Sequence, residues 1–92
     1  MTETVEITRK RLAMRSMRRG IKEMDLILSD FASRALGGYD ATQLALYEAL
    51  LDESDLDIYH WVSGQSAAPA KFAALVGDIT VGAEGLTRPH AT

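Results

Sequence analysis

The sequence predicts an all-α protein, a compact bundle of five short helices that forms one domain over residues 1–82. Apolar residues return every three or four positions through most of the chain, which is the spacing of one helix face. No stretch alternates between apolar and polar residues as a half-buried strand does. Residues that favour helix ends (Asp, Ser, Gly and Pro) stand between the periodic segments. With 92 residues, 47% of them hydrophobic, the chain can build one globular core.

The periodic segments give five expected helices, at residues 6–18, 21–36, 41–51, 55–63 and 69–79. The first contains straight-chain helix formers, with Leu12, Ala13 and Met17 expected to face inward and the arginines outward. Gly20 is expected to end this helix, either as the residue after its C-terminus, where glycine tolerates a left-handed backbone, or as part of a tight turn.

The second expected helix has the clearest period in the chain. Its apolar positions step by three and four residues and form a single stripe: Ile21, Met24, Leu28, Phe31 and Ala35. Leu26 and Ile27 widen the stripe, which predicts that this helix is central. Gly37 and Gly38 are expected to stop it.

The third and fourth expected helices open with capping residues. Asp40 stands three residues before Gln43, which is the spacing of a capping box. Ser54 and Asp57 repeat this arrangement, with Ser54 as the N-cap of the fourth helix, which Gly64 ends. The expected inner faces are formed by Leu44, Tyr47 and Leu51 in the third helix and by Ile58, Trp61 and Val62 in the fourth.

The fifth expected helix follows a linker of small residues at positions 64–68. Pro69 suits the first turn of a helix, where its missing N–H would have no partner in any case. The apolar face of this helix is expected to consist of Phe72, Leu75, Val76 and Ile79. Residues 83–92 have no apolar period and are expected to form a flexible C-terminal tail.

Charge is distributed unevenly along the chain. Seven of the ten basic residues lie within the first 22 positions, and the segment between Arg34 and Lys71 contains acidic residues but no Lys or Arg. The net charge of −3 gives the protein as a whole no electrostatic reason to bind nucleic acid or anionic lipid. The sequence has no cysteine, no apolar stretch near the ~20 residues of a membrane span and no signal-peptide core, so we expect a cytoplasmic protein without a membrane partner.

Few residues have the chemistry for catalysis or metal binding. The two histidines are His60 and His90, and His90 lies in the expected tail. His60 lacks the spacing of a metal-ligand motif with Asp55 or Asp57, so no metal site and no catalytic residue is predicted. The acidic residues from Asp52 onward are better explained as a solvated helix start, where carboxylates complement the helix dipole.

A cationic stripe on the first helix supports an alternative function. Arg11, Arg15, Arg18 and Lys22 recur at helical intervals, and such a stripe would meet phosphates or an acidic protein surface. The alternative is therefore a small regulatory module that binds nucleic acid through its basic N-terminal helix. A solvated outer face also explains the stripe. No aromatic residue interleaves with the basic run to stack on bases, and the domain is acidic overall.

Arg19 and Glu23 flank Gly20 at the junction of the first two expected helices. At a spacing of four residues they would form a surface ion pair, which is the simpler interpretation. They could instead bind a partner, because an arginine fork and a carboxylate make strong charge-assisted hydrogen bonds. Gly20 between them would allow another chain to approach closely.

The same stretch resembles a known protein family. Arg18-Arg19-Gly20-Ile21-Lys22-Glu23, followed by Met24-Asp25, is similar to the Arg-Gly-x-x-Glu signature of the FAD assembly (flavinylation) factors of succinate dehydrogenase. Other segments that fit the family are Arg9-Lys10-Arg11-Leu12, Arg15-Ser16 and the block Tyr47-Glu48-x-Leu50-Leu51 with Asp52, Asp55, Asp57 and Trp61. The resemblance extends over residues 8–79. The sequence departs from the family at Ser54-Asp55-Leu56, where relatives often have a proline before the fourth helix.

The resemblance implies a five-helix assembly factor without enzymatic activity. It would bind the flavoprotein subunit of succinate dehydrogenase, and of the related fumarate reductase, and promote covalent attachment of FAD to a histidine of that subunit. It implies no stably bound cofactor. No nucleic-acid partner is expected, and the protein is expected to be a monomer when free. The residues implied at the partner surface are Arg11, Arg15, Arg18, Arg19, Gly20, Glu23 and Asp25.

Overall fold

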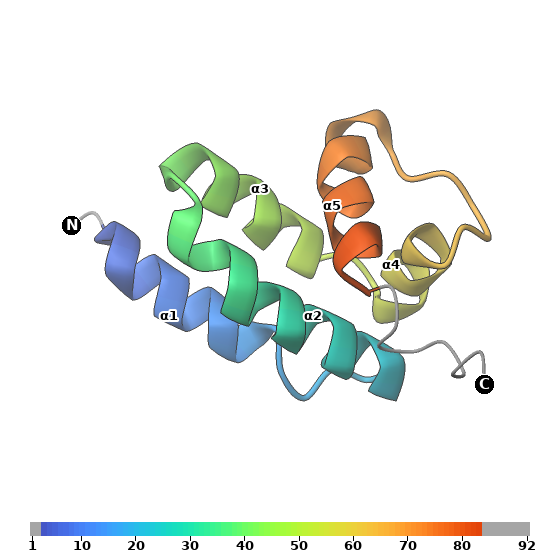
Figure 1. The fold of residues 1–92 in the computed structure, drawn as a ribbon, viewed down its shortest axis with the longest axis horizontal. Helices are drawn as coiled ribbons and strands as arrows, with labels where there is room; N and C mark the ends of the chain where they lie inside the picture. The colour runs from blue at the N-terminus through green and yellow to red at the C-terminus, as the bar shows by residue number, and fades with distance from the viewer. Residues whose placement is uncertain (1–2, 84–92) are drawn as a thin grey trace.

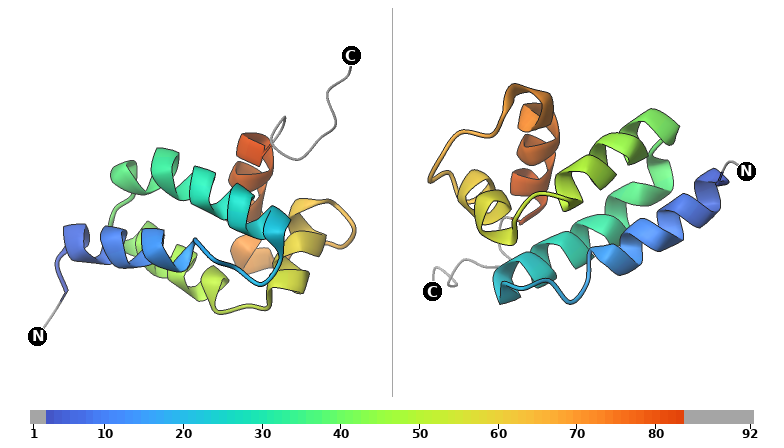
Figure 2. Two further views of the ribbon diagram at one scale, coloured as in Figure 1. Left: turned by 90° about the horizontal axis from the view of Figure 1, so that it is seen from below. Right: turned by 180° about the vertical axis from the view of Figure 1, so that it is seen from behind.

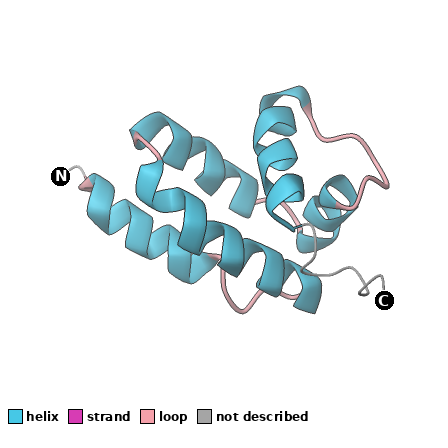
Figure 3. Ribbon diagram, in the orientation of Figure 1, coloured by secondary structure: helices cyan, strands magenta, loops and turns pink. Residues whose placement is uncertain are grey.

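The computed structural model describes residues 3–83, and every regular element in this range is a helix (Figures 1 and 3). The predicted all-α bundle is therefore confirmed. Most of the expected tail, residues 84–92, lies outside the described range. The elements in chain order are α1 (Val5–Arg15), α2 (Lys22–Ala35), the 3-10 turn η1 (Leu36–Gly38), α3 (Ala41–Leu51), α4 (Asp55–Val62), the 3-10 turn η2 (Ala70–Phe72) and α5 (Ala73–Ala83).

Helix α2 is the centre of the bundle, as its apolar stripe predicts. It contacts α1, α4 and α5, and it runs antiparallel beside α1 (Figures 1 and 2). Met24 and Leu28 are fully buried, and Ile27 and Phe31 nearly so. Leu26 departs from the prediction, since 47% of it is exposed. The stripe that faces the core is narrower than the sequence suggests.

Helix α1 ends at Arg15, three residues before the predicted end. The backbone N–H of Ser16 still donates to the Leu12 carbonyl, but the chain then leaves the helical path. The residue with the left-handed backbone is Arg18, with φ of 56°, and not Gly20. The Asp25 carboxylate accepts a hydrogen bond from the Arg18 N–H at 2.8 Å, which satisfies a donor that the turn frees.

The early end of α1 also changes which side chain faces the core. Met17, expected to point inward, lies in the turn and is 51% exposed. The buried residue next to it is Ser16, the C-cap of α1. The prediction for Met17 was wrong because it assumed that helical spacing continues past Arg15.

Helices α3 and α4 begin where the capping residues predict. Asp40 and Gln43 form a complete capping box, and α3 has the predicted bounds. Ser54 accepts a hydrogen bond from the Asp57 N–H at 3.1 Å, and α4 begins at Asp55 as predicted. Helix α4 ends at Val62, one residue before the predicted end.

The last helix is displaced toward the C-terminus. The chain makes a 3-10 turn at Ala70–Phe72, and the α-helix then runs to Ala83 and not to residue 79. Thr80 helps to fix this last part, because its hydroxyl lies 2.8 Å from the Val76 carbonyl and 3.3 Å from the Val62 carbonyl of α4. This packing outweighs the low helix propensity of the glycines in α5. None of the helices within residues 3–83 is long and apolar enough to cross a membrane.

Candidate functional site

The turn between α1 and α2 lies against the connection between α3 and α4 (Figure 2). The Asp55 carboxylate, at the start of α4, joins them. One carboxylate oxygen, Oδ1, lies 2.8 Å from Arg19 Nε and 2.7 Å from Arg19 Nη2. The other, Oδ2, accepts a hydrogen bond from the Gly20 N–H at 2.7 Å. We call this arrangement of Arg19, Gly20 and Asp55 the turn latch.

Arg19 is bonded within its own chain at every guanidinium nitrogen. Besides the ion pair with Asp55, Nη1 donates to the Arg15 carbonyl at 3.0 Å and Nη2 to the Leu51 carbonyl at 3.1 Å. Only 12% of the Arg19 side chain and 20% of the Asp55 side chain are exposed. Arg19 therefore connects the end of α1, the end of α3 and the start of α4. Its ionic partner is Asp55, and not Glu23 as the spacing of four residues suggests.

Gly20 is exposed, and its lack of a side chain matters because of Asp55. A Cβ atom at this position would lie 3.1 Å from Asp55 Oδ2, a tight contact that the carboxylate could relieve only by shifting a few tenths of an ångström. Its backbone is not in the left-handed region, since among the described glycines only Gly64 has positive φ. Gly20 is needed for the close approach of a carboxylate and not for the turn conformation.

The outer side of the turn combines charged and apolar side chains. Arg18, Gly20 and Glu23 are exposed, and so is Lys22 in the first turn of α2. Three large apolar residues near the turn are also about half exposed: Met17 in the turn itself, Leu26, one helical turn beyond Lys22, and Leu56, next to Asp55. Exposed apolar groups beside charged ones are typical of a protein-binding surface.

The remaining residues predicted at the partner surface make bonds inside the protein. Asp25 is half-buried, and its Oδ1 accepts from the Arg18 N–H at 2.8 Å and lies 3.3 Å from the Ser29 hydroxyl. Arg11 pairs with Glu48 on α3 at 2.6 Å, and Arg15 with Asp52 at 2.7 Å. The structure thus leaves Arg18 and Gly20 exposed in the turn and Glu23 exposed at the start of α2. The side chains of Arg11, Arg15 and Arg19 bond to residues of other elements, and Asp25 bonds to the turn.

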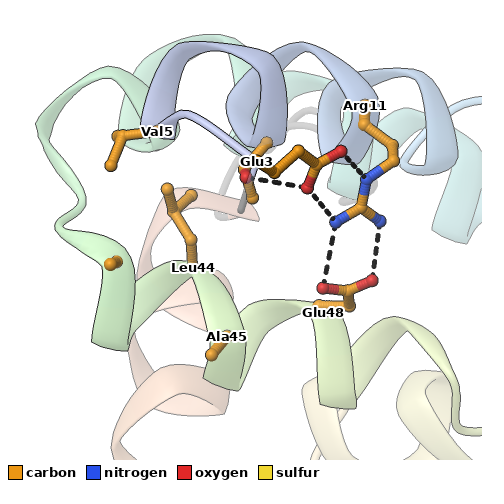
Figure 4. A pocket seen from close by; sticks show the side chains of 8 residues that line it. Glu3, Val5, Arg11, Leu44, Ala45 and Glu48 are labelled. Carbon is orange, nitrogen blue, oxygen red and sulfur yellow. Dashed lines mark hydrogen bonds and ion pairs between the residues drawn. The ribbon is translucent and has the colours of Figure 1, made fainter. Parts of the chain in front are cut away.

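The expected cationic stripe is interrupted in the fold. It assumed one helix through Lys22, but α1 ends at Arg15. Figure 4 shows the Arg11 guanidinium between the carboxylates of Glu3 and Glu48, where α1 packs beside α3. Since Arg11 and Arg15 already meet carboxylates of the same chain, the nucleic-acid alternative gains no support from their geometry.

A shallow hollow of about 220 Å³ lies beside this ion pair (Figure 4). Its lining residues are Glu3, Val5, Thr8, Arg11, Ala41, Leu44, Ala45 and Glu48. Both carboxylates that line it are bonded to Arg11. The hollow therefore belongs to the contact between α1 and α3.

The contact between Arg11 and Glu48 predicts how stability depends on pH. Hydrogen bonding to Arg11 lowers the pKa of the Glu48 carboxyl below its usual 4.5. A carboxyl whose pKa is lowered by folding stabilises the folded state above its unfolded pKa, and this contribution disappears as the pH falls through the folded value. We expect the melting temperature of wild type to fall between about pH 5 and pH 3, and to fall less in Glu48→Gln. Thermal denaturation followed by circular dichroism measures both.

The control is Glu6→Gln, which changes an exposed carboxylate in the first turn of α1 and should behave as wild type. Equal pH profiles for Glu48→Gln and wild type would contradict the assignment of the pH dependence to Glu48.

A buried hydrogen bond lies close to the turn. The Ser16 hydroxyl is 2.6 Å from the Tyr47 hydroxyl and donates to the Leu12 carbonyl at 2.8 Å, which leaves Tyr47 as the donor to Ser16. Both residues are fully buried. Burial raises the pKa of Tyr47 to about 12, so the phenol stays protonated. This bond fixes the C-terminal end of α1 against α3, just before the turn that contains Arg19.

We expect Ser16→Ala to reduce the free energy of unfolding by about 1–3 kcal/mol, because the Tyr47 hydroxyl then stays buried without this acceptor. Urea denaturation measures the loss. The double variant Ser16→Ala/Tyr47→Phe should recover part of it, since removing both polar groups leaves no unsatisfied hydroxyl. The control is Ser33→Ala, an exposed serine of α2, with an expected change within about 0.5 kcal/mol. A loss that small for Ser16→Ala would show that water replaces the missing hydroxyl.

The described residues offer little for metal or acid–base chemistry. Within residues 3–83, no group of three or more His, Cys, Asp or Glu side chains is placed to hold a metal ion. His60 is half-buried on α4, and His90 lies outside the described range. Fold and site together define a small all-α protein whose distinctive surface is an ordered, charged Arg-Gly turn.

The chain belongs to the family described as flavinator of succinate dehydrogenase, whose model matches residues 10–81. The matched range includes the turn latch, Glu23 and all of α2 to α4. The resemblance drawn from the Arg-Gly-x-x-Glu motif is therefore confirmed.

Curated relatives share this family's function in their names. Proteins named succinate dehydrogenase assembly factor 2, mitochondrial, are 48% identical over 61 residues in Debaryomyces hansenii, 46% over 67 residues in Schizosaccharomyces japonicus and 44% over 70 residues in Schizosaccharomyces pombe. These matches cover 66%, 73% and 76% of this chain, and 43%, 47% and 50% of the three relatives. The chain thus spans about half the length of the curated relatives it matches.

The names of the relatives contradict one expectation from the sequence. All three are named as mitochondrial proteins, so the cytoplasmic location expected from the lack of targeting signals is wrong by this comparison. The expectation rested only on the absence of a targeting signal. The names of relatives that are 44–48% identical are stronger evidence than such an absence.

Proposed function

We propose that this protein is an assembly factor that binds the flavoprotein subunit of succinate dehydrogenase and promotes covalent attachment of FAD to it. The observation that carries the proposal is the family match across residues 10–81, which includes the complete Arg-Gly-x-x-Glu motif. In this proposal the protein acts by binding and performs no chemistry of its own. It holds no FAD stably, acts on the FAD of its partner and is a monomer when free.

The geometry of the turn supports a docking role. Gly20 is exposed in the turn and Glu23 is exposed in the first turn of α2, with the half-exposed apolar side chain of Leu26 one helical turn further along α2. A partner would bury the apolar group and bond to the Glu23 carboxylate, whose hydrogen bonds gain strength when water is excluded. Because the Asp55 carboxylate already fixes the Gly20 backbone, little conformational entropy is lost when the partner binds.

Covalent FAD on the flavoprotein subunit tests the proposal. Cells that lack this gene should show a dim flavin fluorescence band for that subunit in a denaturing gel, and the wild-type gene should restore it. Purified flavoprotein subunit with FAD, with and without this protein, gives the same comparison in a defined mixture. An equally bright band in all samples would overturn the proposal. The flavoprotein subunit of fumarate reductase, assayed in parallel, shows whether the factor serves both enzymes.

A further inference from the structure

We infer that Arg19 acts in docking as a positioning residue through Asp55, and that the exposed Glu23 is the member of the motif that contacts the partner. This inference rests on the proposed function. It divides the Arg-Gly-x-x-Glu motif into an inner part, which sets the shape of the turn, and an outer part, which binds. It also adds Asp55, 36 positions away from Arg19, as a working part of the motif.

The hydrogen bonds of Arg19 are the first reason. Nε and both terminal nitrogens are already bonded to Asp55, Arg15 or Leu51, and the side chain is 12% exposed. A partner that bound the Arg19 guanidinium directly would have to displace the partly buried Asp55 carboxylate and leave it without its cation. Breaking such a pair is costly, which favours a latch that stays closed on docking.

The second reason is the bond from Gly20 to Asp55. The same carboxylate that pairs with Arg19 accepts the Gly20 N–H at 2.7 Å, so the position of the exposed Gly20 backbone depends on the ion pair. Gly20 is followed two residues later by Lys22, the first residue of α2. The latch therefore sets both the turn backbone and the point at which α2 begins, and with it the direction of Glu23 in the first turn.

The two roles predict different kinetics of binding. Without the latch, the turn samples several conformations, and only a fraction of molecules can dock at any moment. If that fraction is about a tenth, the association rate constant falls about tenfold while dissociation changes little. A residue that contacts the partner mainly affects the dissociation rate constant. Substitution of Arg19 or Asp55 should therefore lower the association rate constant, and substitution of Glu23 should raise the dissociation rate constant.

The test is surface plasmon resonance with purified flavoprotein subunit of the host's succinate dehydrogenase, at a temperature at which circular dichroism shows every variant folded. The variants are Arg19→Ala, Asp55→Ala, the double variant Arg19→Ala/Asp55→Ala, and Glu23→Ala. We expect both single latch variants to lower the association rate constant by a similar factor, and the double variant to lower it no further than about twofold beyond either. Asp55→Asn, which keeps an acceptor for the Gly20 N–H, should recover part of the rate.

A second arginine–aspartate pair serves as the control. Arg34 pairs with Asp30 within α2 at 2.7 Å, so Arg34→Ala removes a more exposed pair of the same two residue types away from the turn. It should leave both rate constants within about twofold of wild type.

Two results would overturn the inference. One is a double variant whose losses multiply, and the other is an Arg19→Ala variant that raises the dissociation rate constant while Asp55→Ala leaves it unchanged; each would mean that Arg19 touches the partner. If wild type itself does not bind the flavoprotein subunit, the proposed function fails and the inference fails with it. If only the inference is wrong, wild type still binds the flavoprotein subunit normally. Binding by wild type therefore distinguishes failure of the inference from failure of the proposed function.

Discussion

Gly20→Arg is expected to abolish flavinylation while the protein remains folded. An arginine Cβ would lie 3.1 Å from Asp55 Oδ2, and the carboxylate would have to shift by a few tenths of an ångström, which strains its bonds to the Gly20 N–H and to Arg19. The new cationic side chain would also cover the exposed backbone where the partner approaches. We expect a loss of covalent FAD of at least about tenfold, because losing charge-assisted contacts at an interface costs about 2 kcal/mol or more. In-gel flavin fluorescence of cells that carry only the variant gene measures it.

A second glycine gives a matched control for this prediction. Gly37 is exposed, and a Cβ at its position would meet no atom within 4 Å. Gly37→Arg adds the same side chain to the same protein and should support flavinylation at nearly the wild-type level. If Gly20→Arg also supports normal flavinylation and has a normal melting temperature, then neither close approach at this turn nor the latch is needed for function.

Of the variants named here, Phe72→Ala is expected to cause the largest loss of stability. Phe72 is fully buried where η2 meets α5, and its ring centroid lies 6.1 Å from that of Trp61 on α4. Removing a buried phenylalanine ring costs about 3–5 kcal/mol, because apolar contacts are lost and a cavity remains. For a domain of this size the melting temperature should fall by roughly 12 °C or more. Scanning calorimetry measures the change.

The control for this variant is Val81→Ala on α5, where the side chain is 72% exposed. It should change stability by less than about 0.5 kcal/mol. A similarly small effect for Phe72→Ala would mean that α4 and α5 repack around the missing ring, so that the two helices are less firmly joined than their contacts indicate.

Some features of this protein that depend on local sequence were predictable, above all the start of α3 and the central place of α2. The start of α3 follows from Asp40 and Gln43, which bond to nearby backbone atoms and need nothing else from the fold. The central place of α2 follows from the spacing of its apolar residues, because burial of that stripe is the main source of stability available to the helix. The Arg-Gly-x-x-Glu motif likewise led to the family that residues 10–81 match.

Only the tertiary structure decided what the charged residues of the motif do. The sequence suggests that Arg19 pairs with Glu23, since local spacing is all it displays, yet the fold brings Asp55 to Arg19 and Gly20. The four residues of the apparent cationic stripe are likewise separated in the fold. Arg11 and Arg15 form ion pairs with Glu48 and Asp52, Arg18 lies in the turn, and Lys22 begins α2. The physical reason is that an ion pair depends on the distance between charges in space. That distance is set by the packing of α1, α2, α3 and α4 together, and no short stretch of sequence contains it.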